Sequence, residues 1–308
     1  MNSRSCCWLI VSALAITASG AWAQCKPVIG AQNIVTLKQQ VAHGKAAAQC
    51  SLGAMYEDGK GVPQDYAQAA LWYRKAAEQG DLDAQESLGF LYYMGDGTPQ
   101  DYAQAALWFR KAAEQGDAYA QQMLGDLYSD GQGVPQDHAQ AAIWYRQAAT
   151  WYRKAAERGS AYAQDQLGLL YINGRGVPQD NVQAALWLRK AAEQGNRNAQ
   201  VVLGGLYSDG QGVPQDNTRA VFWYRKAAEQ GDAYAQHHLG GLYDKGQSVP
   251  QDYAEAYFWL DLAAAGPLGG ELAAGQRDEA ASHLTPADLS REQERAQKWF
   301  EAHQAKVQ

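Results

Sequence analysis

The chain is built from one segment that recurs at a nearly constant interval. The string W-Y-R-K-A-A-E-Q-G, or a near copy, is preceded by G-x-G-V-P-Q-D and followed by A-Q-x-x-L-G-x-L-Y. The leucines before the glycine of the last string are 36 residues apart, with one interval of 43. They are Leu52, Leu88, Leu124, Leu167, Leu203 and Leu239. Such a period is typical of a solenoid, whose units bury their apolar faces only against neighbours. We expect one elongated domain that functions through a surface.

Each repeat has the pattern of two amphipathic helices. In the third copy Ala120, Leu124 and Tyr128 follow the i, i+4, i+8 spacing of a first helix, which we call helix A. Gly131 is suited to the left-handed conformation that ends it, and Asp137 is suited to cap a second helix, helix B. The same capping residue begins helix B in the other copies, at Asp65, Asp101, Asp180, Asp216 and Asp252. A glycine ends each B helix, at Gly80, Gly116, Gly159, Gly195 and Gly231. The sequence therefore predicts six helix pairs.

The interval of 43 has a visible cause. Residues 144–150 read W-Y-R-Q-A-A-T and residues 151–157 read W-Y-R-K-A-A-E, so seven residues are duplicated. Seven residues add about two helical turns and rotate the apolar stripe by only ~20°. We expect a long third B helix that stays in phase and projects beyond its neighbours or changes the local pitch. A duplication that is merely tolerated is the alternative.

The first residues have the form of a secretory signal. Arg4 precedes an apolar run over residues 6–18, and the run is followed by Ala21-Trp22-Ala23, an A-x-A cleavage site. The run is too short for a permanent membrane span, and nothing later in the chain approaches one. We therefore expect a mature chain from Gln24 in the bacterial periplasm, with secretion as the alternative. Lipidation of Cys25 is disfavoured because Gln24 stands where a lipoprotein signal carries a small residue.

Cleavage would leave two cysteines, Cys25 and Cys50, in an oxidising compartment, where disulfides persist. A bridge would pin the N-terminal segment to the first repeat, and two free cysteines are the alternative. The formal charge of −7 becomes −8 once Arg4 is removed. Basic residues are spread along the repeats, so nucleic acid and anionic lipid surfaces are not expected as partners. The Arg-Lys pairs near the helix B ends are expected to be solvated charges that complement the helix dipole.

The run A-x-x-x-L-G-x-x-Y-x-x-G-x-G-V-x-x-D-x-x-x-A-x-x-W-Y-x-K-A-A-x-x-G, complete in residues 199–231, resembles the Sel1-like repeat (SLR), a relative of the tetratricopeptide repeat. The resemblance covers about residues 46–265 and implies an all-α, right-handed α/α superhelical solenoid that acts as an adaptor. It also implies N- and C-terminal capping helices. A cysteine-rich branch of the family is linked to β-lactam binding and hydrolysis, but this chain has no cysteine after Cys50.

The resulting domain plan has four parts. Residues 1–23 form the signal peptide, and residues 24–45 form an N-terminal cap with a lone helix from Ile34 to His43. Six repeats follow, at residues 46–80, 81–116, 117–159, 160–195, 196–231 and 232–265. Capping helices occupy residues 266–308, where Thr285 is expected as N-cap, Pro286 as the first helical residue and Asp288 as N3.

Comparison of the copies with one another indicates where a partner binds. Packing and turn residues are constant, whereas one stripe of helix A varies from copy to copy. In tetratricopeptide-like arrays this stripe lines the concave groove, and we expect exposed aromatic and acidic side chains there to bind a protein or peptide. The predicted groove residues are Glu86, Phe90, Tyr93, Tyr119, Gln122, Asp126, Tyr162, Asp165, Leu169, Asn198, Tyr234 and His237.

Signs of catalysis are weak. His237 and His238 are adjacent, so on a helix they point about 100° apart and cannot chelate one ion as an i, i+4 pair would. The sequence holds no G-x-S-x-G, Walker A, S-x-x-K or H-E-x-x-H motif. We expect no cofactor, no metal and no enzymatic activity, and a scaffold for protein or peptide partners. The alternatives are a cell-wall enzyme or binder of the β-lactamase or penicillin-binding kind, and a secreted host-interaction factor.

Overall fold

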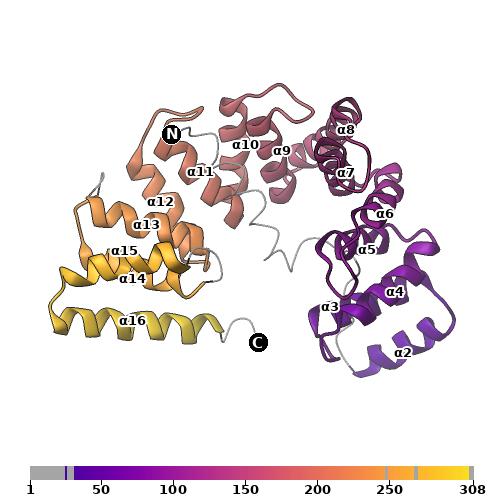
Figure 1. The fold of residues 1–308 in the computed structure, drawn as a ribbon, viewed down its shortest axis with the longest axis horizontal. Helices are drawn as coiled ribbons and strands as arrows, with labels where there is room; N and C mark the ends of the chain where they lie inside the picture. The colour runs from indigo at the N-terminus through magenta and orange to yellow at the C-terminus, as the bar shows by residue number, and fades with distance from the viewer. Residues whose placement is uncertain (1–24, 26–30, 247–248, 267–269, 305–308) are drawn as a thin grey trace. The chain divides into compact units, whose positions relative to one another are not determined.

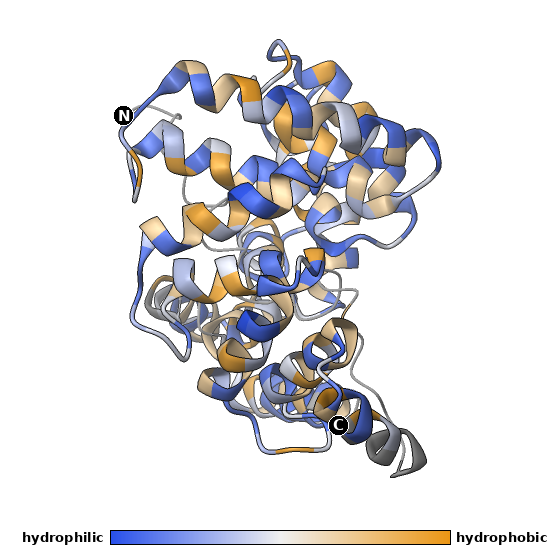
Figure 2. Cartoon of the chain, turned by 90° about the vertical axis from the view of Figure 1, so that its right-hand side faces the viewer, coloured by the Kyte–Doolittle hydropathy of each residue, from blue (hydrophilic) through white to orange (hydrophobic). Residues whose placement is uncertain are grey.

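The structure is a computed structural model that describes Cys25 and residues 31–246, 249–266 and 270–304. The predicted signal peptide lies outside these residues. Every regular element in the described part is an α-helix, as predicted (Figure 1). Figure 2 shows hydrophilic and hydrophobic residues together on the helices, as expected of helices with one buried face. None of the described helices combines the length and apolar character needed to cross a membrane.

The chain forms two compact units, which divide within helix α8. The N-terminal unit takes in α2 (Ala31–Ala42), α3 (Ala46–Asp58), α4 (Tyr66–Glu78), α5 (Leu82–Met94), α6 (Tyr102–Glu114), α7 (Ala118–Asp130) and most of α8 (His138–Glu157). The C-terminal unit takes in α9 (Ala161–Asn173), α10 (Asn181–Glu193), α11 (Arg197–Asp209), α12 (Asn217–Ala228), α13 (Ala233–Lys245), α14 (Tyr253–Ala264), α15 (Gly270–Ser282) and α16 (Pro286–Gln304). Odd-numbered helices from α3 to α13 are the A helices, and even-numbered helices from α4 to α14 are the B helices.

The helix ends follow the predicted capping residues. Asp101 Oδ1 accepts hydrogen bonds from the backbone N–H groups of Ala103 at 2.9 Å and Gln104 at 3.0 Å, which would otherwise be unpaired at the start of α6. The equivalent aspartates cap the other B helices. Gly131 ends α7 with a φ of 70°, in the left-handed region that favours glycine.

Within a helix pair, one glycine lets the two helices approach closely. A Cβ atom on Gly89 of α5 would lie 2.8 Å from Cδ1 of Phe109 on α6, whose side chain is fully buried. The same contact recurs in every pair, 20 residues apart in the chain. Its other instances are Gly53 with Tyr73, Gly125 with Tyr145, Gly168 with Leu188, Gly204 with Tyr224 and Gly240 with Leu260. The L-G dipeptide of the repeat is therefore a packing requirement.

Between pairs, buried glutamines form a repeated hydrogen-bonded link. Gln85 Nε2 donates to the carbonyl oxygen of Ala77 at 3.1 Å, and Gln85 Oε1 accepts from Gln115 Nε2 at 2.8 Å. One A-helix side chain thereby joins the preceding and the following B helix. In the C-terminal unit Gln194 donates to Gln164 and Gln230 donates to Gln200 in the same way.

The basic residues of the repeated string are mostly exposed, as expected, and they also make specific contacts that the sequence did not predict. Arg189 donates from Nη2 to the Tyr207 hydroxyl at 2.6 Å, and Arg110 bonds Tyr128 equivalently, so each arginine links a B helix to the next A helix. Lys111 Nζ lies 4.2 Å from the centre of the Trp108 ring. Hydrogen bonding and ring contact, in addition to the helix dipole, are consistent with the recurrence of R-K.

Helix α8 is continuous over 20 residues, so the duplicated segment extends the helix in phase as predicted. Its buried stripe runs unbroken through both copies and includes Ala141, Tyr145, Ala148, Tyr152 and Ala156. The first copy supplies the ring that packs on Gly125 of α7.

The loop that follows α9 contacts α8 at a different residue from the one that a regular repeat would place there. Gly97 and Gly133 touch the backbone of the first residues of α4 and α6, Tyr66 and Tyr102. Gly176 instead touches the backbone of Tyr145, the eighth residue of α8. All three pairs are 31 residues apart in the chain. The insertion therefore moves the contact point of this loop along α8 by seven residues.

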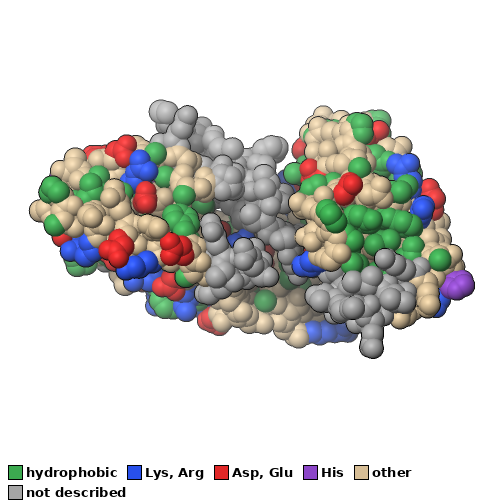
Figure 3. Space-filling model, turned by 90° about the horizontal axis from the view of Figure 1, so that it is seen from below, with side chains coloured by type: hydrophobic (Ala, Val, Ile, Leu, Met, Phe, Trp, Pro, Cys, Tyr) green, Lys and Arg blue, Asp and Glu red, His purple; other side chains and the backbone are tan. Residues whose placement is uncertain are grey.

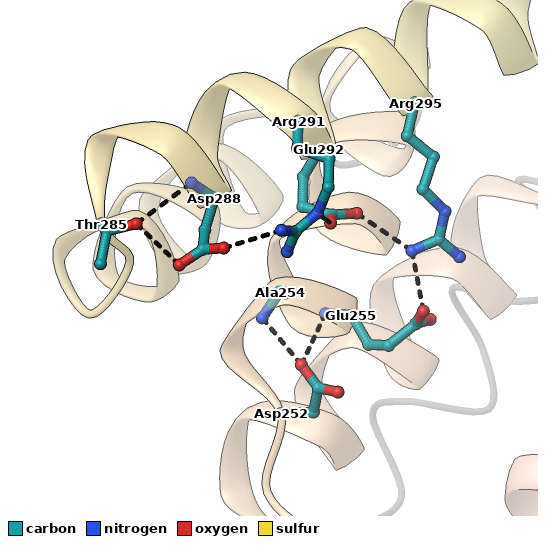
Figure 4. Close-up of polar contacts among 8 residues, drawn as sticks. All are labelled: Asp252, Ala254, Glu255, Thr285, Asp288, Arg291, Glu292 and Arg295. Atoms are coloured by element: carbon teal, nitrogen blue, oxygen red, sulfur yellow. Dashed lines mark hydrogen bonds and ion pairs between the residues drawn. The ribbon is translucent and has the colours of Figure 1, made fainter.

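The C-terminal cap is a pair of helices fixed by a charged network. The Thr285 hydroxyl accepts from the backbone N–H of Asp288 at 3.2 Å, as predicted for an N-cap, and donates to the Asp288 carboxylate at 2.7 Å. Arg295 Nη1 on α16 bonds Glu255 of α14 at 2.7 Å and Glu292 at 3.0 Å (Figure 4). Acidic and basic side chains alternate over the face of this unit seen in Figure 3.

Candidate functional site

The predicted groove residues lie on the A helices but are more buried than expected. Glu86 is 7% exposed and Asp165 is 2% exposed, whereas Tyr234, at 38%, is the only one of the twelve in the exposed class. The other nine are partly buried. The expectation of exposed tyrosines is therefore wrong for Tyr93, Tyr119 and Tyr162. We call the set of twelve the A-helix stripe.

The aromatic members of the N-terminal unit pack on rings of the B helices. Tyr119 lies edge-on to Phe109, with ring centroids 6.4 Å apart, and Tyr93 lies edge-on to Tyr102 at 5.3 Å. Such contacts stabilise the fold beyond the area they bury. Removal of the Tyr119 ring would therefore disturb packing as well as any binding, which makes Phe90 the cleaner probe of the stripe in this unit.

Two partly buried carboxylates of the N-terminal unit have partners within it. Asp126 accepts a hydrogen bond from the Tyr145 hydroxyl at 2.6 Å and pairs with Arg175 at 2.6 Å. Glu57 accepts from the Tyr73 hydroxyl at 2.5 Å. Burial raises the pKa of both carboxyls, and these partners offset part of the rise. Glu57 was not predicted as a stripe residue, although it occupies in the first repeat the position that Tyr93 occupies in the second.

Glu86 differs from these carboxylates. It is buried, and no described residue donates a hydrogen bond to it or pairs with it. Burial raises its pKa well above the usual range, and the negative charges of Asp117, Asp83 and Glu57 raise it further. At the equivalent position of α7, Gln122 Oε1 is buried and has no hydrogen-bond partner in the described part of the chain. Burying a carboxylate without a partner is costly.

In the C-terminal unit Asp165 holds this position. Asn198 Nδ2 donates to both of its oxygens, at 3.0 Å and 2.9 Å, and Gln166 Nε2 donates at 3.2 Å. Burial raises the pKa of Asp165 to about 7, even though these hydrogen bonds favour the ionised form. Two adjacent A helices, α9 and α11, are thereby joined through the stripe.

His237 and His238 belong to an aromatic cluster on α13. The His238 ring stacks on Tyr224 with centroids 5.2 Å apart and contacts Tyr234 at 4.2 Å, and the two histidine rings are 5.4 Å apart. Burial lowers the pKa of His237, and it lowers that of His238 to about 4. Both imidazoles are therefore neutral near pH 7, and packing explains His238.

The structure joins Cys25 and Cys50 in a disulfide, with Cα atoms 5.4 Å apart. Cys50 occupies the position on α3 that Glu86 occupies on α5. Asp81 completes the one group of three metal-type ligands found among the described residues. Because the two sulfurs are bonded to each other, they offer no thiolate to a metal. The group is therefore a structural cross-link rather than a metal site.

A second surface, not anticipated from the sequence, lies on the B helices. One apolar side chain recurs just before the Trp position and stays exposed by 43–51%. These residues are Leu71, Leu107 and Ile143 in the N-terminal unit and Leu186 and Phe222 in the C-terminal unit. We call them the B-helix row. The sequence does show an apolar residue before the tryptophan in each repeat, but an apolar residue at a helix position is normally expected to be buried.

Comparison with protein families identifies the repeat. The family model described as Sel1 repeat matches residues 46–81, 82–117, 118–150, 147–160, 161–196, 197–232 and 233–267. The third repeat is matched in two overlapping pieces, which coincide with the duplicated segment of α8. No curated protein matches the chain.

One solved structure gives the same assignment, and two others are similar in sequence. A Sel1 repeat protein from Oxalobacter formigenes is 35% identical, covering 77% of this chain and 92% of its own, with a TM-score of 0.62. A protective antigen with an SLR fold from uropathogenic Escherichia coli is 30% identical, covering 90% and 73%, with a TM-score of 0.39. A Klebsiella pneumoniae protein described as a putative Sel1 repeat protein is 25% identical, covering 69% and 99%, with a TM-score of 0.44.

Proposed function

Because the chain belongs to the Sel1 repeat family, whose fold suggests a protein-interaction scaffold, we propose that it is a non-catalytic scaffold that binds a protein or peptide along its A-helix stripe. One observation supports this choice of surface, although the B helices also bury unpartnered atoms, at Trp72 Nε1 and Trp108 Nε1. Two buried acceptor oxygens of the stripe, Gln122 Oε1 and Asn198 Oδ1, have no hydrogen-bond partner in the described residues. A bound backbone or side chain would satisfy such atoms, and unsatisfied ones are costly in a folded protein.

The test compares the two candidate surfaces directly. A photo-crosslinking amino acid is placed at Phe90 in the stripe or, as the matched control, at Leu107 in the B-helix row. Irradiation of intact cells followed by mass spectrometry identifies any captured protein. We expect one specific adduct from position 90 and none from position 107. An adduct formed only from position 107 would transfer the binding function to the B helices.

The combined change Phe90→Ala and Tyr93→Ala asks whether the captured partner depends on the stripe. We expect the adduct formed from a neighbouring stripe position, Gln122, to be lost while the circular dichroism of the array is retained. Retention of this adduct in the double variant would argue against the stripe.

We also propose that the chain acts in an oxidising compartment outside the cytoplasm, with the bacterial periplasm first. The signal-like residues 1–23 and the Cys25–Cys50 disulfide support this location. Osmotic-shock fluid should contain a protein that begins at Gln24 and migrates differently after reduction. A protein found in the culture supernatant instead would favour secretion, and one that retains residues 1–23 in the cytoplasm would refute export.

A further inference from the structure

We propose that Glu86 anchors a cationic side chain, a lysine or arginine, of the bound partner. The inference rests on the proposed function and names the chemistry of the ligand at one point of the same stripe. Its starting point is a contrast among four of the carboxylates on the A helices, Glu57, Glu86, Asp126 and Asp165.

Three of the four obtain hydrogen-bond donors from this chain. Glu57 has the Tyr73 hydroxyl, Asp126 has Tyr145 and Arg175, and Asp165 has Asn198. Glu86, although 93% of its surface is buried (7% exposed), has no donor among the described residues. The repeat therefore has ways to satisfy a carboxylate at these positions and does not use them at Glu86. A donor from outside the chain is the explanation that fits the pattern.

The electrostatic surroundings specify a cation rather than a neutral donor. The charged groups that act on Glu86 are Asp117 from α7, Asp83 from its own helix and Glu57 from α3, and all three are acidic. Their combined effect, with burial, raises the pKa of Glu86. A positive charge would offset the repulsion from these carboxylates and favour the ionised form of Glu86, whereas a neutral amide would leave the repulsion in place.

Two neighbouring groups on α7 suit the same ligand. Burial raises the pKa of Tyr119, and the negative charge of Glu86 raises it further; Gln122, with its unpartnered Oε1, lies one helical turn after Tyr119 on α7. Lysine offers three N–H donors and arginine five, so either has enough donors for a carboxylate and an additional acceptor. The aromatic ring supplies a surface over which a cation is attracted.

The experiment selects short random peptides, displayed on phage, against the purified mature protein. We expect the selected peptides to share a lysine or arginine at one position. Replacement of that residue by methionine or citrulline should weaken binding by about tenfold or more. Glu86→Gln should weaken the parent peptide equally and leave the substituted peptide unchanged, because each change removes the same contact.

The matched control is Glu114→Gln, which removes the same charge from an exposed side chain on α6. It should change affinity by less than about twofold. Selected peptides that need Phe90 and Tyr93 but share no basic residue would refute the anchor and leave the proposed function intact. Failure to select any peptide that depends on Phe90 and Tyr93 would count against the proposed function itself.

A stability measurement separates an external ligand from an internal one. Without ligand, Glu86→Gln should raise the melting temperature, because it removes an unpaired buried charge. Lys26 follows the disulfide-bonded Cys25 in the sequence and is the chain's own candidate for this role. If Glu86→Gln lowers the melting temperature, and Lys26→Met abolishes that loss, then Glu86 is satisfied internally and the proposal is wrong.

Discussion

At the scale of single residues, adjacent glycines in one helix have opposite roles. A Cβ on Gly240 of α13 would lie 2.7 Å from Cγ of Leu260, whereas nothing lies within 4 Å of a Cβ on Gly241. Gly240→Ala should therefore reduce the free energy of unfolding by about 1–3 kcal/mol through overpacking. Gly241→Ala should increase it by about 0.5–1 kcal/mol, the helix-propensity gain of alanine. Urea denaturation of both variants tests the pair, and equal effects would contradict the packing account.

The buried carboxyl of Asp165 should make the stability of the folded protein depend on pH. Its pKa is about 7 in the folded protein and 3.8 for an unperturbed carboxyl, so the folded state binds the proton more tightly. The stability that it contributes is therefore highest in acid, falls as the pH rises from about 4 to about 7, and stays low above that. Asp165→Asn should stabilise the protein at pH 8, by up to about 4 kcal/mol, and have little effect at pH 4.

Thermal melts of Asp165→Asn across this pH range provide the measurement. The control is Glu193→Gln, which changes the charge of an exposed side chain on α10. Its difference from the wild type should not vary in this way. A stabilisation by Asp165→Asn that is as large at pH 4 as at pH 8 would show that burial of the charge is not the cause.

The same residue scale shows what sequence could and could not predict. The caps Asp101 and Thr285 were predicted because capping depends on local spacing. The burial of Glu86 and Asp165 was not, because a position that varies between copies has the same sequence signature whether solvent or a neighbouring A helix faces it. The glutamine link was missed for a related reason. Gln85 and Gln115 belong to different repeats, and only the stacking brings them together.

At the scale of elements, α8 permits a deletion that should be tolerated. Removal of residues 144–150 brings Tyr152 into the place of Tyr145 opposite Gly125. It also puts His138, the first residue of the helix, 31 positions before Gly176, the spacing found in the other repeats. The apolar stripe turns by only about 20°. We expect cooperative unfolding with a helical content per residue close to that of the wild type, measured by circular dichroism.

Deletion of five residues, 146–150, is the matched control. It rotates the second half of the stripe by about 140° and directs Tyr152 and Ala156 away from the core. This variant should lose cooperative unfolding or expose hydrophobic surface to a dye. If the two deletions behaved alike, the rotation of the apolar stripe would not decide whether a deletion in α8 is tolerated. At this scale the sequence predicted the family relationship, the helix pairs and the continuous apolar stripe of α8. It did not predict the displaced contact of Gly176.

At the scale of the whole molecule, stability should be distributed along the chain because repeats contact only their neighbours. The disulfide closes a loop of 25 residues at the first repeat, which corresponds to about 3 kcal/mol in the chain-entropy model. We expect reduction, or Cys25→Ser, to accelerate hydrogen exchange in α3 and α4 and to leave α11 to α14 unchanged. Hydrogen exchange with mass spectrometry resolves these segments. Uniform acceleration along the chain would indicate a single cooperative unit.

The docking point of the repeat after α8 has a consequence for how such a protein can evolve. A tandem duplication of one short coding segment changed the position at which a neighbour attaches and conserved the chemistry of the attachment, since Gly176 still meets helix backbone at a separation of 31 residues. The contact between a loop and the preceding B helix can therefore shift in a step of seven residues without a new interface.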